Sequence, residues 1–213
     1  MPPDWWRGTT PQRLPSYGGT PVGGEIREFD AARFPVNNTS LLRSLYFQEA
    51  RASGIEIELD EVSLTVCWSK FERCTFRQRS GRLNAYGFAP QGSFGNRPSI
   101  YLDCIFAGVR FKTLGRFVTG AARFVRCRFE RCHFHGHFSR GADYIECTFT
   151  GRIDGCVWFG TVPPGDTEAG RRNVITGNDF TGAVLGPNIG WRDGFDFSAQ
   201  RWPVGYQPAV EQR

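Results

Sequence analysis

The chain of 213 residues is long enough for one domain with a continuous core, and its net charge of +5 gives only a mild preference for acidic partners. No apolar run approaches the length of a membrane span, so no association with a membrane is expected. The seven cysteines follow neither a disulfide framework nor a CxxC metal pattern, which favours reduced thiols and a cytoplasmic protein.

The first 54 residues are predicted to form an extended arm and a short capping helix. Residues 1–34 are rich in proline, glycine and tryptophan, and we expect Trp5 and Trp6 to pack the arm against the body. Residues 38–53 begin with a threonine or serine that can serve as an N-cap, and good helix formers follow. This pattern predicts a helix that covers the open end of the core.

From residue 55 to residue 200, apolar residues recur every five positions, which is neither the helical period nor strand alternation. A small or thiol-bearing residue stands two positions before nearly every large one. A five-residue unit buries nothing alone, but stacked coils bury each large side chain between its equivalents above and below. The residues predicted to fill this core are Phe71, Phe76, Phe106, Phe111, Phe124, Phe129, Phe134, Tyr144, Phe149, Cys127, Cys132 and Cys147.

Three stretches depart from this rhythm. Residues 77–98 and 162–173 are polar and carry glycine or proline, and both are predicted to be loops that leave the wall of the solenoid. Residues 201–213 are predicted to be a C-terminal tail. An aromatic cluster near that end is expected either to cap the last coil or to form a homodimer contact, because an open solenoid end exposes strand edges. The cluster comprises Trp191, Phe195, Phe197, Trp202 and Tyr206.

The repeated unit, a small residue two positions before a large one, resembles the pentapeptide-repeat family. The unit is clearest in CTF at 74–76, CIF at 104–106, ARF-VR-CRF-ER-CHF at 122–134, ADY-IE-CTF at 142–149 and NDF-TG-AVL at 178–185. The resemblance implies an all-β fold, a right-handed quadrilateral β-helix in which the large and the small residue point inwards. Ser139 and Asp154 stand at central positions where an apolar residue is expected, which predicts irregular corners there.

The resemblance also implies coils of about twenty residues, so that equivalent residues stack about 4.8 Å apart. Aromatic side chains should then form a ladder inside, and opposite charges should meet outside. The expected pairs are Phe124 with Tyr144, Phe129 with Phe149, Arg123 with Asp143, and Arg126 with Glu146.

The three histidines, His133, His135 and His137, alternate along one segment and are the candidates for metal ligands. His133 and His135 fall at outward positions and His137 at an inward one, and no carboxylate or cysteine is placed to complete an open site. We therefore expect no metal and no cofactor. We do not expect an enzyme, because the thiols should be buried and no serine lies in a GxSxG context.

Arg110, Lys112, Arg128 and Arg131 lack an acidic partner one coil away and are predicted to form a basic wall. Because the aromatic residues point inwards, nucleic-acid bases would have nothing to stack on, and a protein partner is favoured over nucleic acid. The predicted function is a non-catalytic interaction or scaffold module that uses this wall or the loop at 77–98. The alternative implied by the resemblance is a DNA mimic that binds a type II topoisomerase (gyrase), which the basic charge disfavours.

Overall fold

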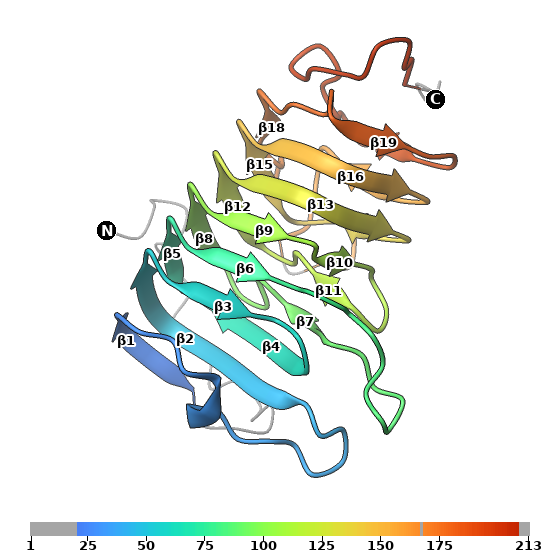
Figure 1. Cartoon of the computed structure of the whole chain (residues 1–213). Helices are drawn as coiled ribbons and strands as arrows, with labels where there is room; N and C mark the ends of the chain where they lie inside the picture. Colours follow the sequence, from blue (N-terminus) through green and yellow to red (C-terminus); the bar gives the residue numbers. More distant parts are fainter. Residues whose placement is uncertain (1–20, 167, 209–213) are drawn as a thin grey trace.

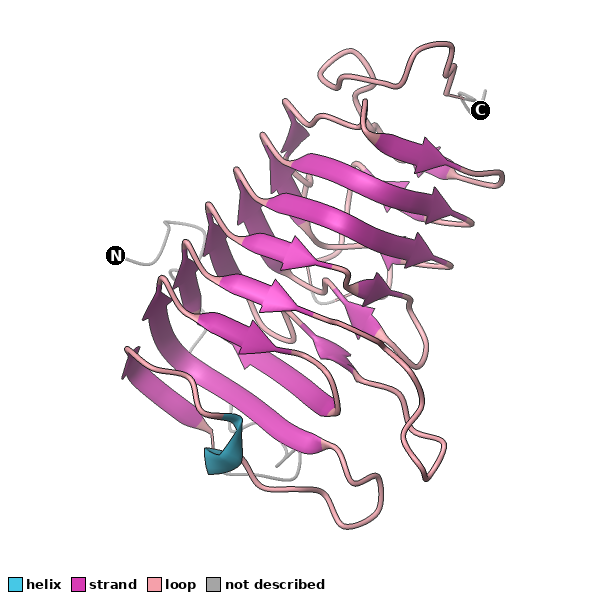
Figure 2. Ribbon diagram, viewed as in Figure 1, coloured by secondary structure: helices cyan, strands magenta, loops and turns pink. Residues whose placement is uncertain are grey.

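The protein is a stack of coils built from short parallel strands (Figures 1 and 2). The structure is a computed structural model that describes residues 21–166 and 168–208. Every pairing between its named strands is parallel, and the two ends of the stack lie far apart. In the part of the chain that the structure describes, the only helical element is the 3-10 turn η2 (Ala31–Arg33), and no helix there could cross a membrane.

Each coil passes through four walls, which we number in chain order. Wall 1 contains the first half of β2 (Arg43–Ser53), β4 (Val62–Cys67), β7 (Gln91–Ser93) and β11 (Phe117–Val118), and the end of β2 turns into wall 2, where it pairs with β5. Wall 1 continues along the chain as a separate sheet of β14 (Phe138–Ser139), β17 (Val157–Phe159) and β20 (Gly190–Arg192). Wall 2 contains β5 (Lys70–Glu72), β8 (Ser99–Leu102), β12 (Ala122–Val125), β15 (Asp143–Ile145) and β18 (Ile175–Thr176).

Walls 3 and 4 share their two longest strands. Wall 3 contains β3 (Glu56–Glu58), β6 (Thr75–Arg77), β9 (Ile105–Ala107) and the first halves of β13 (Arg128–His135) and β16 (Thr148–Asp154). Wall 4 contains β10 (Arg110–Phe111), the second halves of β13 and β16, and β19 (Ala183–Leu185). Strand β1 (Val22–Ile26) pairs with β2 and extends the stack at its N-terminal end.

The helix predicted over residues 38–53 is wrong, because strand β2 occupies residues 43–53. Helix propensity is a weak preference that tertiary packing overrides. Here β2 pairs with β4, β5 and β1, and Leu45 and Phe47 are fully buried in the first coil. The predicted arm with Trp5 and Trp6 lies mostly outside the described residues.

Aromatic rings form two continuous stacks inside the coils. On wall 3, neighbouring rings lie nearly parallel with centroids 4.6 to 5.1 Å apart, and the stack runs through Phe76, Phe106, Phe129, Phe149 and Phe180. On wall 2, centroid distances are 5.0 to 5.3 Å along Phe71, Tyr101, Phe124 and Tyr144. The expected stacks of Phe124 on Tyr144 and of Phe129 on Phe149 are thus confirmed. These rings supply both apolar burial and favourable ring–ring geometry.

The bounds of the two predicted loops can be compared with the strands of the structure. Strand β7 lies inside the stretch 77–98, so the irregular segment between β6 and β7 is residues 78–90. The second loop lies between β17 and β18, and an antiparallel bridge from Thr161 to Arg172 joins its two ends.

The C-terminal aromatic cluster packs on the last coil of the chain itself. The Trp202 ring stacks on Phe180 with centroids 5.0 Å apart, and Trp191 stacks on Trp158 at 5.8 Å. Trp191 and Phe195 are buried. The cluster therefore contributes to closing the solenoid end within one chain, and a homodimer through it stays a prediction.

Candidate functional site

The four residues of the predicted basic wall do not share one wall. Arg110 is on β10 and Lys112 follows it, so both belong to wall 4. Arg128 lies on wall 3, where it forms an ion pair with Glu130 at 3.2 Å, and Arg131 occupies the corner between walls 3 and 4. Within the described residues, no ion pair is found for Arg110, Lys112 or Arg131. Of the four predicted residues, the three without an ion pair lie on wall 4 or at its corner with wall 3.

A shallow depression lies beside Lys112, between the loop at 78–90 and the shorter loop at 112–116. We call it the loop depression, and its volume is about 330 Å³. Its lining comprises Leu83, Gly87, Phe88, Ala89, Gln91, Lys112, Leu114, Gly115 and Arg116. Leu83 is 60% exposed and Leu114 is 81% exposed, which is unusual for leucine. Two large apolar side chains therefore border a site that also holds two cations.

Arg116 is the cation of the loop depression that is least satisfied. Its Nη1 is buried and makes no hydrogen bond with any residue that the structure describes. Burial, and to a smaller extent the nearby Arg110, lowers the pKa of the Arg116 guanidinium. A buried donor without an acceptor is costly, and because Arg116 lines the depression, a carboxylate bound there would be a favourable partner for its charge.

The Arg110 side chain lies against the base of the longer loop. Its backbone N–H donates to Gln78 Oε1 at 2.9 Å. A Cβ built on Gly81 would lie 3.0 Å from Arg110 Cδ, so the arginine stem packs closely on this glycine. The loop at 78–90 and the cations of wall 4 thus form one continuous surface.

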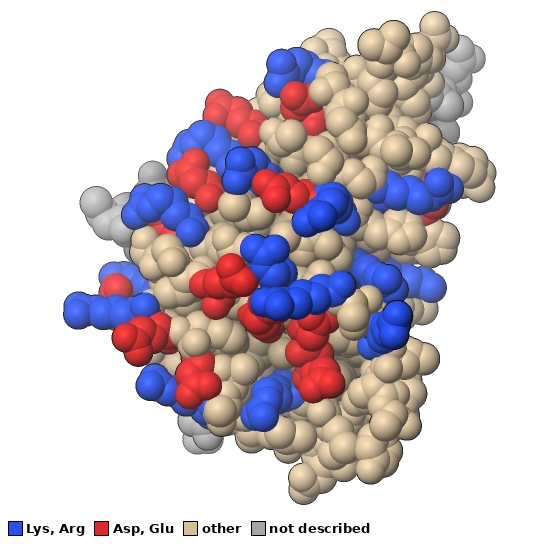
Figure 3. Space-filling view, viewed as in Figure 1, with Lys and Arg blue, Asp and Glu red and all other residues tan. Residues whose placement is uncertain are grey.

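The other walls carry charges that are paired across coils. Figure 3 shows Lys and Arg interleaved with Asp and Glu over the face that carries walls 2 and 3. The Arg123 Nη2 lies 2.7 Å from Asp143 Oδ2, as expected. Arg126 lies one coil from Glu146, whose charge contributes to raising the pKa of the guanidinium, but its direct ion pair is with Asp103 on the preceding coil at 2.8 Å. Arg126 has an acidic residue on each neighbouring coil, Asp103 and Glu146, and the sequence spacing alone does not predict which of them forms the ion pair.

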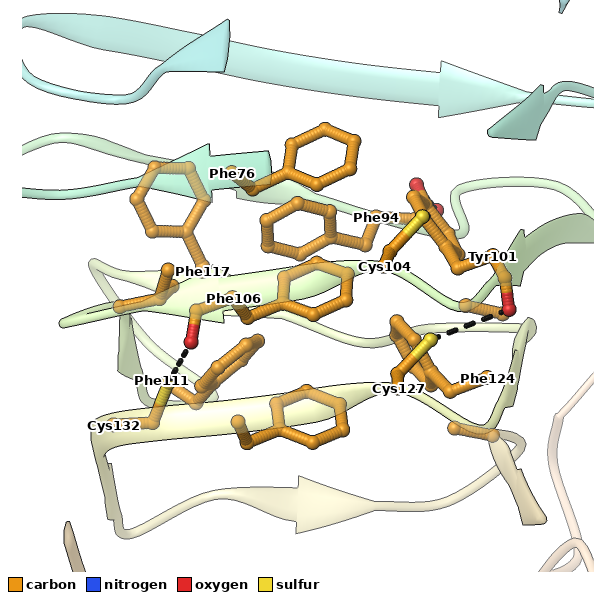
Figure 4. Close-up of a cluster of buried hydrophobic side chains, with 14 of the residues drawn as sticks. Phe76, Phe94, Tyr101, Cys104, Phe106, Phe111, Phe117, Phe124, Cys127 and Cys132 are labelled. Atoms are coloured by element: carbon orange, nitrogen blue, oxygen red, sulfur yellow. Dashed lines mark hydrogen bonds between the residues drawn. The ribbon is translucent and has the colours of Figure 1, made fainter. Parts of the chain in front are cut away.

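Cys74, Cys104, Cys127 and Cys147 form a thiol column along one corner inside the solenoid, and Cys132 lies apart from it (Figure 4). Cys127 Sγ lies 3.3 Å from Tyr101 O, and Cys132 Sγ lies 3.1 Å from Phe106 O, so each thiol donates to a backbone carbonyl of the preceding coil. Burial raises the pKa of Cys127 and Cys132, and it raises that of Cys156 to about 11. The thiolate is the reactive form, so these side chains are structural and not nucleophilic.

We expect the native protein to react with less than one equivalent of DTNB near neutral pH, because all seven free thiols are buried. In concentrated guanidinium, all seven should react. Absorbance of the released thionitrobenzoate measures both values. Rapid reaction of one or more thiols in the native state would show that the coils open around them far more easily than their burial indicates.

The histidines separate into two environments. His137 is fully buried, its Nε2 lies 3.1 Å from Thr119 Oγ1, and burial lowers its pKa to about 3, so the ring is neutral at pH 7. His133 and His135 point outward from wall 4, where Asp154 on β16 lies beside both. The expectation that no carboxylate lies beside these histidines is therefore wrong.

The prediction that Asp154 occupies an interior position fails because the length of the coil changes just before it. Phe129 pairs with Phe149, twenty positions later, but Cys132 pairs with Gly151, only nineteen later, because the register shifts between them. Ile153 is therefore buried opposite Phe134, and Asp154 faces outward in register with His135. Ser139, by contrast, is an interior residue, as predicted from its position.

Comparison with known proteins gives little beyond the fold. No family model matches the sequence, and no curated protein matches it. Among solved structures, a trypsin-treated variant of QnrB1, a plasmid-mediated fluoroquinolone resistance protein, is similar to this chain with 13% sequence identity and a TM-score of 0.30, covering 86% of this chain and 80% of that one. A likeness this distant supports no inference about function.

The fold assignment rests instead on the chain itself. Parallel strands on four walls, inward aromatic residues at five-residue spacing, and small residues or thiols two positions before them are all present in the described coils. The chain is therefore a parallel β-helix of five-residue units, the architecture of pentapeptide-repeat proteins.

Proposed function

We propose that the chain is a non-catalytic interaction module, and that its protein partner docks an acidic and apolar segment in the loop depression. The observation that carries the proposal is the meeting of exposed leucines and under-satisfied cations in one place. Lys112 and Arg116 line the depression, Arg110 lies beside it, and Arg116 Nη1 has no acceptor among the described residues. Protein interfaces combine apolar anchors with charge complementarity in this way.

A rigid scaffold supports this role. The loops at 78–90 and 112–116 leave adjacent coils whose interiors are filled by stacked rings, so their bases are held by the core. Many proteins bind their partners through loops that a rigid scaffold holds in place. Such loops lose less conformational entropy when the partner binds.

The DNA-mimic alternative requires a continuous acidic surface. On the face drawn in Figure 3, carboxylates alternate with arginines and form no continuous acidic stripe. Glu56, Glu58 and Asp103 are paired with Arg77, Arg79 and Arg126, respectively. A surface of paired charges presents little net negative potential to a site built for phosphates, so we favour the loop depression over mimicry of DNA.

We expect the double variant R110E/K112E to lose most of the partner captured from a native lysate, about tenfold or more, because it reverses the charge beside an acidic ligand. The matched control is R128E/R131E, which makes the same change of charge outside the depression. It should capture nearly as much partner as the wild type. Quantitative mass spectrometry of the captured proteins measures the ratio, and nuclease treatment should not change it.

Three outcomes would contradict the proposal. Equal capture by both double variants would mean that the partner does not bind in the loop depression. Loss of capture after nuclease would mean that the cations bind nucleic acid. Capture of a type II topoisomerase that survives R110E/K112E would favour the mimic.

A further inference from the structure

His133 and His135 stand two residues apart on β13, so both imidazoles project from the outer side of wall 4. Asp154 ends β16 on the next coil, directly beside His135 in the strand register. The Nε2 of His133 lies 3.8 Å from Asp154 Oδ1, and one ligand atom from each of the three residues lies within 4.8 Å of the others. Two imidazoles and one carboxylate at this separation can surround a single ion.

We propose that His133, His135 and Asp154 form a binding site for a divalent transition-metal ion. Imidazole nitrogen and carboxylate oxygen are the ligands that Zn²⁺ and its first-row neighbours accept together, at about 2.0 to 2.2 Å from the metal. Ligand atoms bound to one such ion lie roughly 3 to 4 Å from each other. The inference does not depend on the proposed protein partner.

The state of His133 supports this assignment. Its Nε2 is buried and makes no hydrogen bond with any residue that the structure describes, although the nitrogen faces Asp154. Buried polar atoms in folded proteins nearly always have a partner, and a binding site for an ion is one of the explanations for an exception. A metal ion between His133 Nε2 and Asp154 Oδ1 would satisfy both atoms.

Arg152 holds the carboxylate in the orientation that the site needs. Its Nε donates to Asp154 Oδ2, so that Oδ1 is left facing the two imidazoles. Partners of this kind, which hold a ligand without touching the metal, orient the ligand groups of protein metal sites. The carboxylate therefore needs no rearrangement to present one oxygen to an ion.

One contact must open for the ion to enter. His135 Nδ1 and Asp154 Oδ1 form a tight hydrogen bond, and an ion would take the place of the shared proton. The His135 side chain is 58% exposed, so rotation of this imidazole towards solvent provides the space. Metal binding at this position therefore exchanges one hydrogen bond for three metal–ligand bonds, and a neutral imidazole bound through Nδ1 carries its proton on Nε2.

Nearby cations limit how tightly the ion binds and suggest what completes its coordination. Arg110 pairs in register with His133, and His133 with Arg152, so two guanidinium groups border the site. Their repulsion lowers the affinity for a cation, but the site is on the surface, where solvent and salt screen it. Three protein ligands leave positions open on the ion, and water or an anionic group would fill them.

Isothermal titration of the full-length protein with ZnCl₂, in a phosphine reductant, tests the site. We expect one ion per chain. The variants His133→Ala, His135→Ala and Asp154→Asn should each lower the affinity by about tenfold or more, since each removes one of three ligands. His133 and His135 are exposed, and Asp154→Asn keeps the shape of a side chain that is only 12% exposed, so the variants should fold. Glu130→Gln, on the same strand but outside the site, is the matched control and should bind as the wild type does.

Absorption spectra with Co²⁺ in place of Zn²⁺ give a second readout. Nitrogen and oxygen ligands should produce weak visible bands without the intense thiolate charge-transfer band that cysteine ligation adds. The proposal is overturned if the wild type binds no ion, if the three variants bind as tightly as Glu130→Gln, or if the thiolate band appears. Equal partner capture by R110E/K112E and R128E/R131E, with zinc binding by the wild type intact, would contradict the proposed function and leave the metal site standing.

Discussion

Replacement of Phe129 by alanine is expected to lower the free energy of unfolding by about 3 to 5 kcal/mol. Phe129 is fully buried at the centre of the wall 3 stack, with ring centroids 4.9 Å from Phe106 and 4.7 Å from Phe149. It also contacts Phe124 and Phe134 edge to face. Removing the ring leaves a cavity that strands held by hydrogen bonds on two coils cannot close, and the lost burial is added to the cost of the cavity.

Thermal and denaturant unfolding followed by circular dichroism would measure this loss, which corresponds to a decrease in Tm of roughly 10 °C for a chain of this size. Phe138→Ala is the control, because Phe138 is 45% exposed and should change stability by less than about 1 kcal/mol. Similar losses for the two variants would mean that the stacked rings contribute no more to stability than a surface phenylalanine.

Gly151→Ala is expected to destabilise the protein by about 3 kcal/mol or more, through a clash of backbone atoms and through strain. Gly151 has a φ of +100°, and a Cβ built on it would lie 2.2 Å from Cys132 O and 2.8 Å from Cys132 N. Both neighbours are main-chain atoms of the adjoining coil, so neither can rotate away. The change would therefore push β13 and β16 apart at the point where their register shifts.

Gly155→Ala separates the two contributions. Gly155 also has a left-handed φ, of +55°, but its added Cβ would meet nothing closer than 3.7 Å. It should cost about 1 to 2 kcal/mol, the strain alone. Equal losses of unfolding free energy for the two alanine variants, measured by urea titration, would show that the close approach of the coils at Gly151 has no energetic weight.

The interior was predictable from the sequence because one rule repeats along it. Every coil must bury its large residues against the same positions of its neighbours, so the five-residue spacing of phenylalanine determines both the fold and the stacks. The segment at 38–53 carries the same spacing at Leu42, Phe47 and Ala52, and all three are buried. Its helix-forming residues obscure this signal, and the pairing of β2 with β4 and β1 makes the segment a strand.

The proposed metal site and the loop depression both depend on departures from the five-residue rule, so the sequence pattern does not predict them. The coil is one residue shorter between Phe149 and Gly151 than between Phe129 and Cys132. Asp154 therefore lies beside His135, at the position that a twenty-residue spacing assigns to Gly155. The loop depression forms because two loops of unequal length, 78–90 and 112–116, leave the stack side by side. Loop conformation depends on local contacts that no periodicity describes.

The buried thiol column gives the protein a chemical dependence on its own fold. While the coils stay stacked, each thiol is shielded and its neighbours are held apart by the strand spacing. Once the chain opens in air, seven ordinary thiols become free to cross-link in arrangements that the coils cannot accommodate. Unfolding without a reductant then becomes a one-way process, and the working lifetime of the molecule is set by how fast it opens rather than by its equilibrium stability.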